Sequence, residues 1–202
     1  MSIEDQKREL ALDLHKMNAL KFGTFTYNSG IIAPMYIDLR LFVSYPATLK
    51  KVAKIYAQML EGLEYDRLAG VAYGALAIAG AISLELEKPW IFMRKEGLQK
   101  DHGLTKSIEG EFDKGDKIVM IEDLVTTAKA LTQAIAAFED KELVVNDAIV
   151  LLDYEKGGRK LLESKGYGVH AFVTVRELVE IMKSEKIIDA AKYKECVDFL
   201  ES

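Results

Sequence analysis

Short apolar runs alternate with amphipathic stretches along most of this chain. The runs have the length and composition of buried strands, and the stretches between them repeat apolar positions at helical spacing. Strands are predicted at 67–72, 90–93, 117–121, 144–152 and 170–175. Helices are predicted at 3–20, 46–63, 75–87, 126–138 and 159–165, then from 178 onwards, ending in a surface helix at 193–200. Strands separated by helices indicate parallel crossovers, so the predicted fold class is α/β, with a central, mostly parallel sheet flanked by helices.

The first forty residues follow a different pattern. Residues 22–39 are rich in strand-forming types and are interrupted by Asn28, Ser29 and Gly30, a turn signal, which predicts a β-hairpin. No repeat or linker divides the 202 residues. We therefore expect a single domain, 1–202, carrying a small added subdomain.

Composition and charge narrow the class of protein. The net charge of −5 argues against broad, unspecific binding of nucleic acid. The single cysteine, Cys196, rules out an internal disulfide and a cysteine-based zinc site, and we expect it to be a buried thiol. The first residues lack an apolar signal core, and no apolar run reaches the ~18 residues that span a bilayer. These features predict a soluble, cytoplasmic protein.

The segment 117–130 carries the strongest candidate chemistry. Its apolar strand ends in two acids, Glu122 and Asp123, and two residues later Thr126 and Thr127 are predicted to open a helix. Hydroxyls and free backbone N–H groups at a helix start form a site suited to a phosphate. Two carboxylates beside that site can hold ribose hydroxyls and favour positive charge developing on the sugar. The structural alternative is an acidic turn followed by an N-cap threonine.

A second candidate lies in the long polar segment 94–109. It places Arg94, Lys95, Lys100 and His102 on a loop with almost no apolar anchor. Loops of this length are uncommon, and most are functional lids or disordered. Basic groups on a lid can neutralise a negatively charged leaving group and exclude water from a reaction. The structural alternative is a solvated, charged loop.

Five segments, in this order along the chain, resemble motifs of the orotate type of type I phosphoribosyltransferases. Residues 22–40 are similar to the family's N-terminal hood, and 70–76 to its pyrophosphate loop, in which some members carry a lysine where Gly74 stands here. Residues 93–103, Met-Arg-Lys-Glu-Gly-Leu-Gln-Lys-Asp-His-Gly, resemble the lid of the orotate enzymes. Residues 117–130 resemble the family motif for 5-phosphoribosyl-1-pyrophosphate (PRPP), and 151–158 the family's Leu-Asp-Arg-x-x-Gly-Gly.

The resemblance covers roughly residues 8–200 and implies Mg-dependent transfer of phosphoribose from PRPP to orotate. The products are orotidine 5′-monophosphate and pyrophosphate, in the synthesis of UMP. It implies a hood formed mainly by about 1–40 and a homodimer that shares the lid loop between subunits. It also implies that Mg²⁺ arrives chelated by PRPP, without a permanent metal site in the protein.

The resemblance also assigns site residues. Three are expected to be catalytic, namely Lys100, Asp123 and Glu122. The PRPP site is expected to comprise Arg94, Lys95, Lys100, His102, Glu122, Asp123, Leu124, Val125, Thr126, Thr127, Ala128, Lys129, Ala130, Tyr73 and Gly74. The orotate site is expected to comprise Thr126, Tyr154, Tyr36, Ile37 and Asn28.

Three of these positions depart from the family pattern. The usual glycine is Ala128, the hood lysine is Asn28, and the arginine that pairs with the carboxylate of orotate is Tyr154. A phenol does not reproduce the charged, bidentate contact of a guanidinium, and losing such a bond costs ~1.5–3 kcal/mol. Lys156 and Arg159 are the candidates to replace it. Two other functions therefore stay open: a phosphoribosyltransferase for a different base, and a non-catalytic regulator that binds PRPP or a nucleotide.

Overall fold

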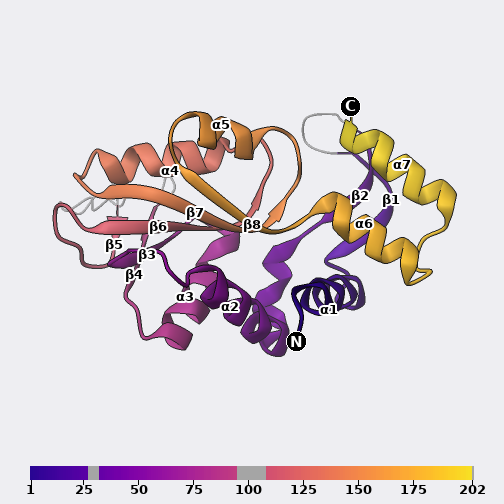
Figure 1. Ribbon diagram of the computed structural model, residues 1–202, viewed down its shortest axis with the longest axis horizontal. Helices are drawn as coiled ribbons and strands as arrows, with labels where there is room; N and C mark the ends of the chain where they lie inside the picture. Colours follow the sequence, from indigo (N-terminus) through magenta and orange to yellow (C-terminus); the bar gives the residue numbers. More distant parts are fainter. Residues whose placement is uncertain (27–31, 95–107, 202) are drawn as a thin grey trace, which may run out of the picture.

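The computed structural model describes residues 1–26, 32–94 and 108–201, and its central feature is a six-stranded sheet (Figure 1). The strand order is β5-β4-β3-β6-β7-β8. The strands are β3 (Arg67–Gly70), β4 (Trp90–Met93), β5 (Ile108–Glu109), β6 (Lys117–Val125), β7 (Val144–Asp153) and β8 (Gly168–Thr174). Only the two-residue β5 runs antiparallel to its neighbour, β4; the other pairs are parallel. The predicted α/β fold with a mostly parallel sheet is confirmed.

Helices cover both faces of this sheet. One face carries α2 (Pro46–Met59) and α3 (Gly74–Leu86), and the other carries α4 (Lys129–Glu139) and α5 (Gly158–Ser164) (Figure 1). Side chains of β6 alternate between the two cores that result: Val119 and Ile121 pack with the α2 and α3 side, Ile118 and Met120 with the α4 and α5 side. No helix within the described ranges is long and apolar enough to cross a membrane.

A second group of elements lies beside the sheet. The strands β1 (Leu20–Thr26) and β2 (Ile32–Ile37) pair antiparallel, which confirms the predicted hairpin strands; the turn between them, with Asn28, lies outside the described residues. The remaining helices are α1 (Ile3–Lys16), the 3₁₀ helix η1 (Leu39–Ser44), α6 (Val175–Ser184) and α7 (Ala190–Glu201). Although α6 and α7 come last in the chain, α6 contacts α1, and α7 contacts β2 (Figure 1).

The helix α7 is only partly a surface helix. It buries Cys196 completely and Leu200 almost completely in the core beneath it. This confirms the expectation of a buried thiol. Burial in this apolar setting raises the pKa of Cys196 to about 11, so the thiol remains protonated at neutral pH.

Two boundaries differ from the predictions in the region of the candidate site. The strand β6 continues through Glu122 and Asp123 as far as Val125, so the acids belong to the strand instead of following it. The helix α4 begins at Lys129, because Ala128 adopts a left-handed conformation (φ 59°, ψ 18°) that a right-handed helix does not contain. The prediction that Thr126 and Thr127 open the helix was therefore wrong, since both lie in the loop before it.

Candidate active site

A hollow of about 320 Å³ lies at the carboxyl end of β6. The carboxyl ends of strands in open parallel sheets are where such folds bind ligands. The hollow is lined by Glu122, Leu124, Val125, Thr126, Thr127, Ala128, Lys129, Ala130, Leu131 and Gln133. Most of the residues that the motif at 117–130 predicts for a phosphate site therefore surround one concavity. A cavity of about 260 Å³ between α1 and α2 lies away from these strand ends.

The loop 126–128, here called the phosphate loop, connects β6 to α4. Thr126 and Thr127 are exposed, and so is Lys129 at the first position of the helix. The first N–H groups of a helix have no acceptor within the helix, and they form the positive end of its dipole. The loop therefore combines hydroxyls, free amides and one ammonium group, an arrangement that suits a phosphate.

The segment that follows β7 holds the phosphate loop in place. The backbone N–H of Tyr154 donates to the Val125 carbonyl at 2.8 Å, and that of Gly158 donates to the Thr126 carbonyl at 2.8 Å. A Cβ atom at position 158 would lie 2.4 Å from the Thr126 oxygen and 2.6 Å from the Ala128 nitrogen. Only glycine fits this contact between two backbones.

Ala128 holds the phosphate loop in a conformation that favours glycine. A left-handed conformation costs an alanine roughly 1–2 kcal/mol, whereas glycine adopts it freely. We expect Ala128→Gly to raise the free energy of unfolding by up to about 1 kcal/mol. Glycine removes the strain of the left-handed conformation from the folded state, and this gain is larger than the loss from the greater conformational entropy of glycine in the unfolded chain. Chemical denaturation measures the change. The matched control is Ala130→Gly, inside the first turn of α4, which is expected to lower stability by about 1 kcal/mol; equal losses in both variants would contradict the argument.

The two acids form a compact pair beside the phosphate loop. Glu122 is 6% exposed and Asp123 is half-buried. The Asp123 N–H donates to Glu122 Oε1 at 3.2 Å, and Asp123 Oδ1 accepts from the Leu124 N–H at 2.8 Å. Burial raises the pKa of Asp123 above its ordinary value, although hydrogen bonds with Glu122 and the backbone act in the opposite direction. Burial and these hydrogen bonds therefore together set the charge of Asp123.

Gly74, at the start of α3, packs directly against this pair. A Cβ atom at position 74 would lie 1.9 Å from Asp123 Oδ2 and 2.5 Å from Asp123 Cγ. The carboxylate occupies the space that any side chain at this position would need. Tyr73, the residue before it, is 58% exposed, so the predicted pyrophosphate loop contains an accessible aromatic side chain.

Tyr56 fixes the end of β6 from the side of α2. Its side chain is completely buried, and its hydroxyl donates to the Glu122 carbonyl at 2.5 Å. Burial, with the nearby charges of Asp123 and Glu122, raises the Tyr56 pKa well above the ordinary value, so the hydroxyl stays a donor. The sequence analysis missed this residue, because an aromatic side chain on the apolar side of a helix has the pattern of core packing. Tyrosine instead of phenylalanine is the available signal, since a buried hydroxyl needs a partner.

The strands β1 and β2 and the start of η1 hold two predicted site residues. Tyr36 is half-buried and lies against Phe25, with 5.7 Å between ring centroids, and Ile37 is 9% exposed. Arg40 donates from Nε and Nη2 to Asp38 at 2.7 and 2.8 Å, and from Nη2 to the Tyr36 hydroxyl at 3.3 Å. The positive charge of Arg40 also acts to lower the pKa of Asp123. Arg40 therefore links this region to the acid pair electrostatically, and the predictions did not select it.

Other predicted site residues are placed as follows. Arg94 is ion-paired with Glu109 at the edge of the sheet. Tyr154 is 6% exposed and belongs to the main hydrophobic core. The predicted lid residues Lys95, Lys100 and His102, and Asn28 of the hood, lie outside the described residues.

The two cations proposed to replace the family arginine are bound to other groups. Lys156 Nζ donates to the carbonyls of Phe199 at 2.8 Å and Leu200 at 3.3 Å. Arg159 Nε pairs with Glu163 at 2.8 Å, one turn along α5. Each cation therefore already has a partner in this structure.

Comparison with known proteins agrees with this site. The sequence model of the phosphoribosyl transferase domain matches residues 42–170. The orotate phosphoribosyltransferase of Pyrococcus abyssi is 35% identical over 176 residues, which cover 86% of this chain and 96% of that protein. The uridine 5′-monophosphate synthase of Bos taurus is 34% identical over 194 residues, 95% of this chain but only 40% of that protein. The structure of Leishmania donovani UMP synthase superposes with a TM-score of 0.86 at 36% identity, covering 96% of this chain and 42% of that one.

The fold, the phosphate loop and these matches show that the chain belongs to the phosphoribosyltransferase family. Within the family it groups with the orotate phosphoribosyltransferases, as its motifs predicted. The chain spans about two fifths of the bovine relative and nearly the whole of the archaeal one.

Proposed function

We propose that this protein transfers phosphoribose from PRPP to orotate, yielding orotidine 5′-monophosphate and pyrophosphate for UMP synthesis in the cytoplasm. The observation that carries the proposal is the phosphate loop at the start of α4, placed beside two carboxylates at the end of β6. In this reaction the bond from ribose C1 to the pyrophosphate oxygen breaks, and a bond from C1 to N1 of orotate forms. The site has to bind one phosphate, hold a sugar and stabilise positive charge at C1.

The described residues fit these three tasks. The 5′-phosphate lies against the hydroxyls of Thr126 and Thr127 and the first amides of α4, with Leu124, Val125, Ala128, Lys129 and Ala130 shaping the loop around it. Glu122 and Asp123 hold the ribose hydroxyls, and their negative charge stabilises an oxocarbenium-like transition state. Such stabilisation acts most strongly in a site that excludes water, and Glu122 is nearly inaccessible.

The leaving group requires positive charge on the opposite side of the sugar. We assign pyrophosphate binding to Arg94, Lys95, Lys100 and His102, together with Tyr73 and the backbone at Gly74. Lys100 is the proposed catalytic cation, because an ammonium group on a closing lid can neutralise pyrophosphate as it departs. We assign orotate binding to Tyr36, Ile37, Thr126 and Tyr154, together with Asn28, which lies outside the described residues.

We also propose that Mg²⁺ reaches the site as an ion carried by the substrate. The paired carboxylates of Glu122 and Asp123 offer the oxygen donors that Mg²⁺ prefers, beside the sugar. When bound, Mg²⁺ neutralises the charge of the pyrophosphate.

We also propose that the protein is a homodimer that shares the lid loop across subunits. Large apolar side chains on η1 and α3, two elements in contact with each other, support this proposal. Val43 is 68% exposed and Leu84 is 84% exposed, and Tyr45 beside η1 is 41% exposed. Contiguous apolar patches at the surface are typical of contact sites between proteins, so these side chains are the candidates for a subunit contact.

The test is a spectrophotometric assay of the purified protein with PRPP, Mg²⁺ and orotate. We expect orotate absorbance to fall only when PRPP is present, and orotidine 5′-monophosphate to accumulate in equal amount. PRPP binding without orotate consumption would contradict the proposal.

The second candidate function is transfer to a different base. It is favoured by the burial of Tyr154 and by the fact that Lys156 and Arg159 are already bound to other groups of the protein. A panel of purine and pyrimidine bases distinguishes it, and PRPP binding with no base consumed would identify a regulator.

A further inference from the structure

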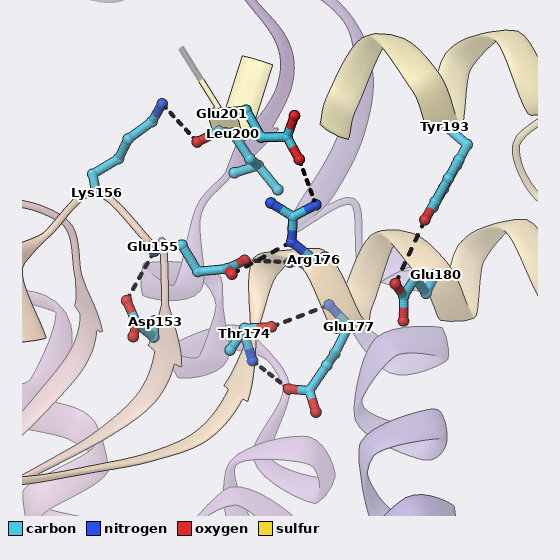
Figure 2. Close-up of polar contacts among 10 residues, drawn as sticks. All are labelled: Asp153, Glu155, Lys156, Thr174, Arg176, Glu177, Glu180, Tyr193, Leu200 and Glu201. Carbon is cyan, nitrogen blue, oxygen red and sulfur yellow. Dashed lines mark hydrogen bonds and ion pairs between the residues drawn. The ribbon is translucent and has the colours of Figure 1, made fainter. Parts of the chain in front are cut away.

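Two neighbouring residues after β7, Glu155 and Lys156, are each bound to the end of a different helix (Figure 2). The Glu155 carboxylate accepts from the backbone N–H of Arg176 at 3.1 Å, in the first turn of α6, and pairs with the Arg176 guanidinium at 3.5 Å. The Lys156 ammonium donates to the carbonyls of Phe199 and Leu200, in the last turn of α7. Lys156 also lies 4.9 Å from the centroid of the Phe199 ring.

Each charge matches the helix end that it meets. The start of a helix offers free N–H groups and a positive dipole end, which favour the Glu155 carboxylate. The last turn offers free carbonyls and a negative dipole end, which favour the Lys156 ammonium. Arg176 Nη1 also contacts Glu201 Oε1 at 3.3 Å, so a single ion-pair chain joins α6, α7 and the segment after β7 (Figure 2).

The backbone of Glu155 has an uncommon, left-handed conformation. Glu155 has φ 56°, and its N–H donates to Asp153 Oδ1 at 2.8 Å. Asp153 is itself 7% exposed. A non-glycine residue keeps a left-handed conformation only where its surroundings fix it. The helix ends and the buried Asp153 supply those fixing contacts.

The opposite side of the same segment supports the phosphate loop. The N–H groups of Tyr154 and Gly158 bond to the carbonyls of Val125 and Thr126. The segment 153–158, here called the latch, therefore has helix ends on one side and the phosphate loop on the other. The helix α7 can therefore affect substrate binding through the latch, without direct contact between α7 and the substrate.

We infer that α7 positions the phosphate loop through the latch, with Lys156 and Glu155 as positioning residues. The inference rests on the proposed function in assigning the loop to the 5′-phosphate of PRPP. Loss of the latch contacts should leave the acid pair in place, because Glu122 and Asp123 are held by Tyr56 and by β6 itself. The latch should therefore affect PRPP binding more than the chemical step.

The test compares Lys156→Met, which keeps the aliphatic stem, with Lys156→Arg, which keeps a cation able to reach the helix end. The matched control is Lys194→Met, which removes an exposed ion pair with Asp198 on the same helix. For Lys156→Met we expect the KM for PRPP to rise about tenfold, with kcat changed less than about twofold. Exchange of the Tyr154 and Gly158 amide hydrogens, whose N–H groups donate to the Val125 and Thr126 carbonyls, should become faster in the same variant. Lys156→Arg and Lys194→Met should both resemble the unmodified protein.

Three results would overturn the inference. The first is unchanged exchange at Tyr154 and Gly158 together with unchanged PRPP affinity in Lys156→Met. The second is failure of Lys156→Arg to restore both, and the third is an equal effect from Lys194→Met. If Lys156→Met does not fold, Glu155→Gln removes the charge that pairs with Arg176 while nearly keeping the shape of the side chain, and it is judged by the same criteria. If the unmodified protein does not consume orotate, the proposed function fails, while hydrogen exchange at Tyr154 and Gly158 still decides the role of the latch.

Discussion

Replacing Asp123 by asparagine is expected to lower kcat for transfer to orotate by about two to three powers of ten. The carboxylate lies at the end of β6, packed against Gly74 and beside the phosphate loop. Asparagine keeps its shape but removes the negative charge that stabilises the developing sugar cation. Steady-state kinetics with PRPP and orotate measures the loss. The control is Asp113→Asn, whose side chain is 91% exposed in a surface turn, and which should keep full activity.

The same substitution is expected to preserve or increase stability. Burial raises the pKa of Asp123, so the folded protein binds this proton more tightly than the unfolded chain does. Between the ordinary and the raised pKa, this group therefore makes stability fall as the pH rises. Above that window the buried charge lowers the free energy of unfolding by an amount that no longer changes with pH, and asparagine removes this loss.

Activity is expected to decline on the acid side. As the pH falls through the raised pKa of Asp123, the carboxylate needed for catalysis becomes protonated. A variant with normal kcat, or with a stability loss that explains its low activity, would contradict this account.

Gly158→Ala is expected to raise the KM for PRPP at least about tenfold and to lower the free energy of unfolding by about 1–3 kcal/mol. The added methyl group would lie 2.4 Å from the Thr126 carbonyl oxygen, so one of two backbones has to move. Movement of the phosphate loop misplaces the amides that bind the phosphate. Steady-state kinetics with varied PRPP and chemical denaturation measure the two effects separately.

Gly80→Ala is the matched control for this prediction. Gly80 lies inside α3, and a Cβ atom there would meet only Trp90, at an ordinary 3.7 Å. Alanine also favours a helix more than glycine does, so this variant should be as stable as the unmodified protein or more so. Normal PRPP affinity in Gly158→Ala would show that the segment after β7 does not set the shape of the phosphate loop.

The sheet could be predicted because buried parallel strands leave a continuous apolar signal. The strand Trp90–Met93 was placed at the observed residues, and β3, β6, β7 and β8 were found within a few residues of theirs. The start of α4 was missed for a physical reason. Alanine is the strongest helix former, and nothing local reveals that Ala128 turns left-handed under contact with Gly158.

The candidate site could be predicted only where its parts are neighbours in sequence. Glu122, Asp123 and the two threonines form one local motif, and Glu122 and both threonines line a single hollow in the structure. The contacts that hold the motif join distant residues, such as Tyr56 with Glu122 and Lys156 with Leu200. Such pairs have no periodicity or spacing of their own, so they become visible only when the chain is folded.

Gly74 lies so close to Asp123 that a side chain at position 74 would need the space that the Asp123 carboxylate occupies. A side chain at position 74 cannot be present while the Asp123 carboxylate keeps its present orientation, because its Cβ atom would lie 1.9 Å from Asp123 Oδ2. A lysine introduced at this position would therefore displace the Asp123 carboxylate from its present orientation. Its effect would not add to that of a change at Asp123, because both substitutions alter the same acid.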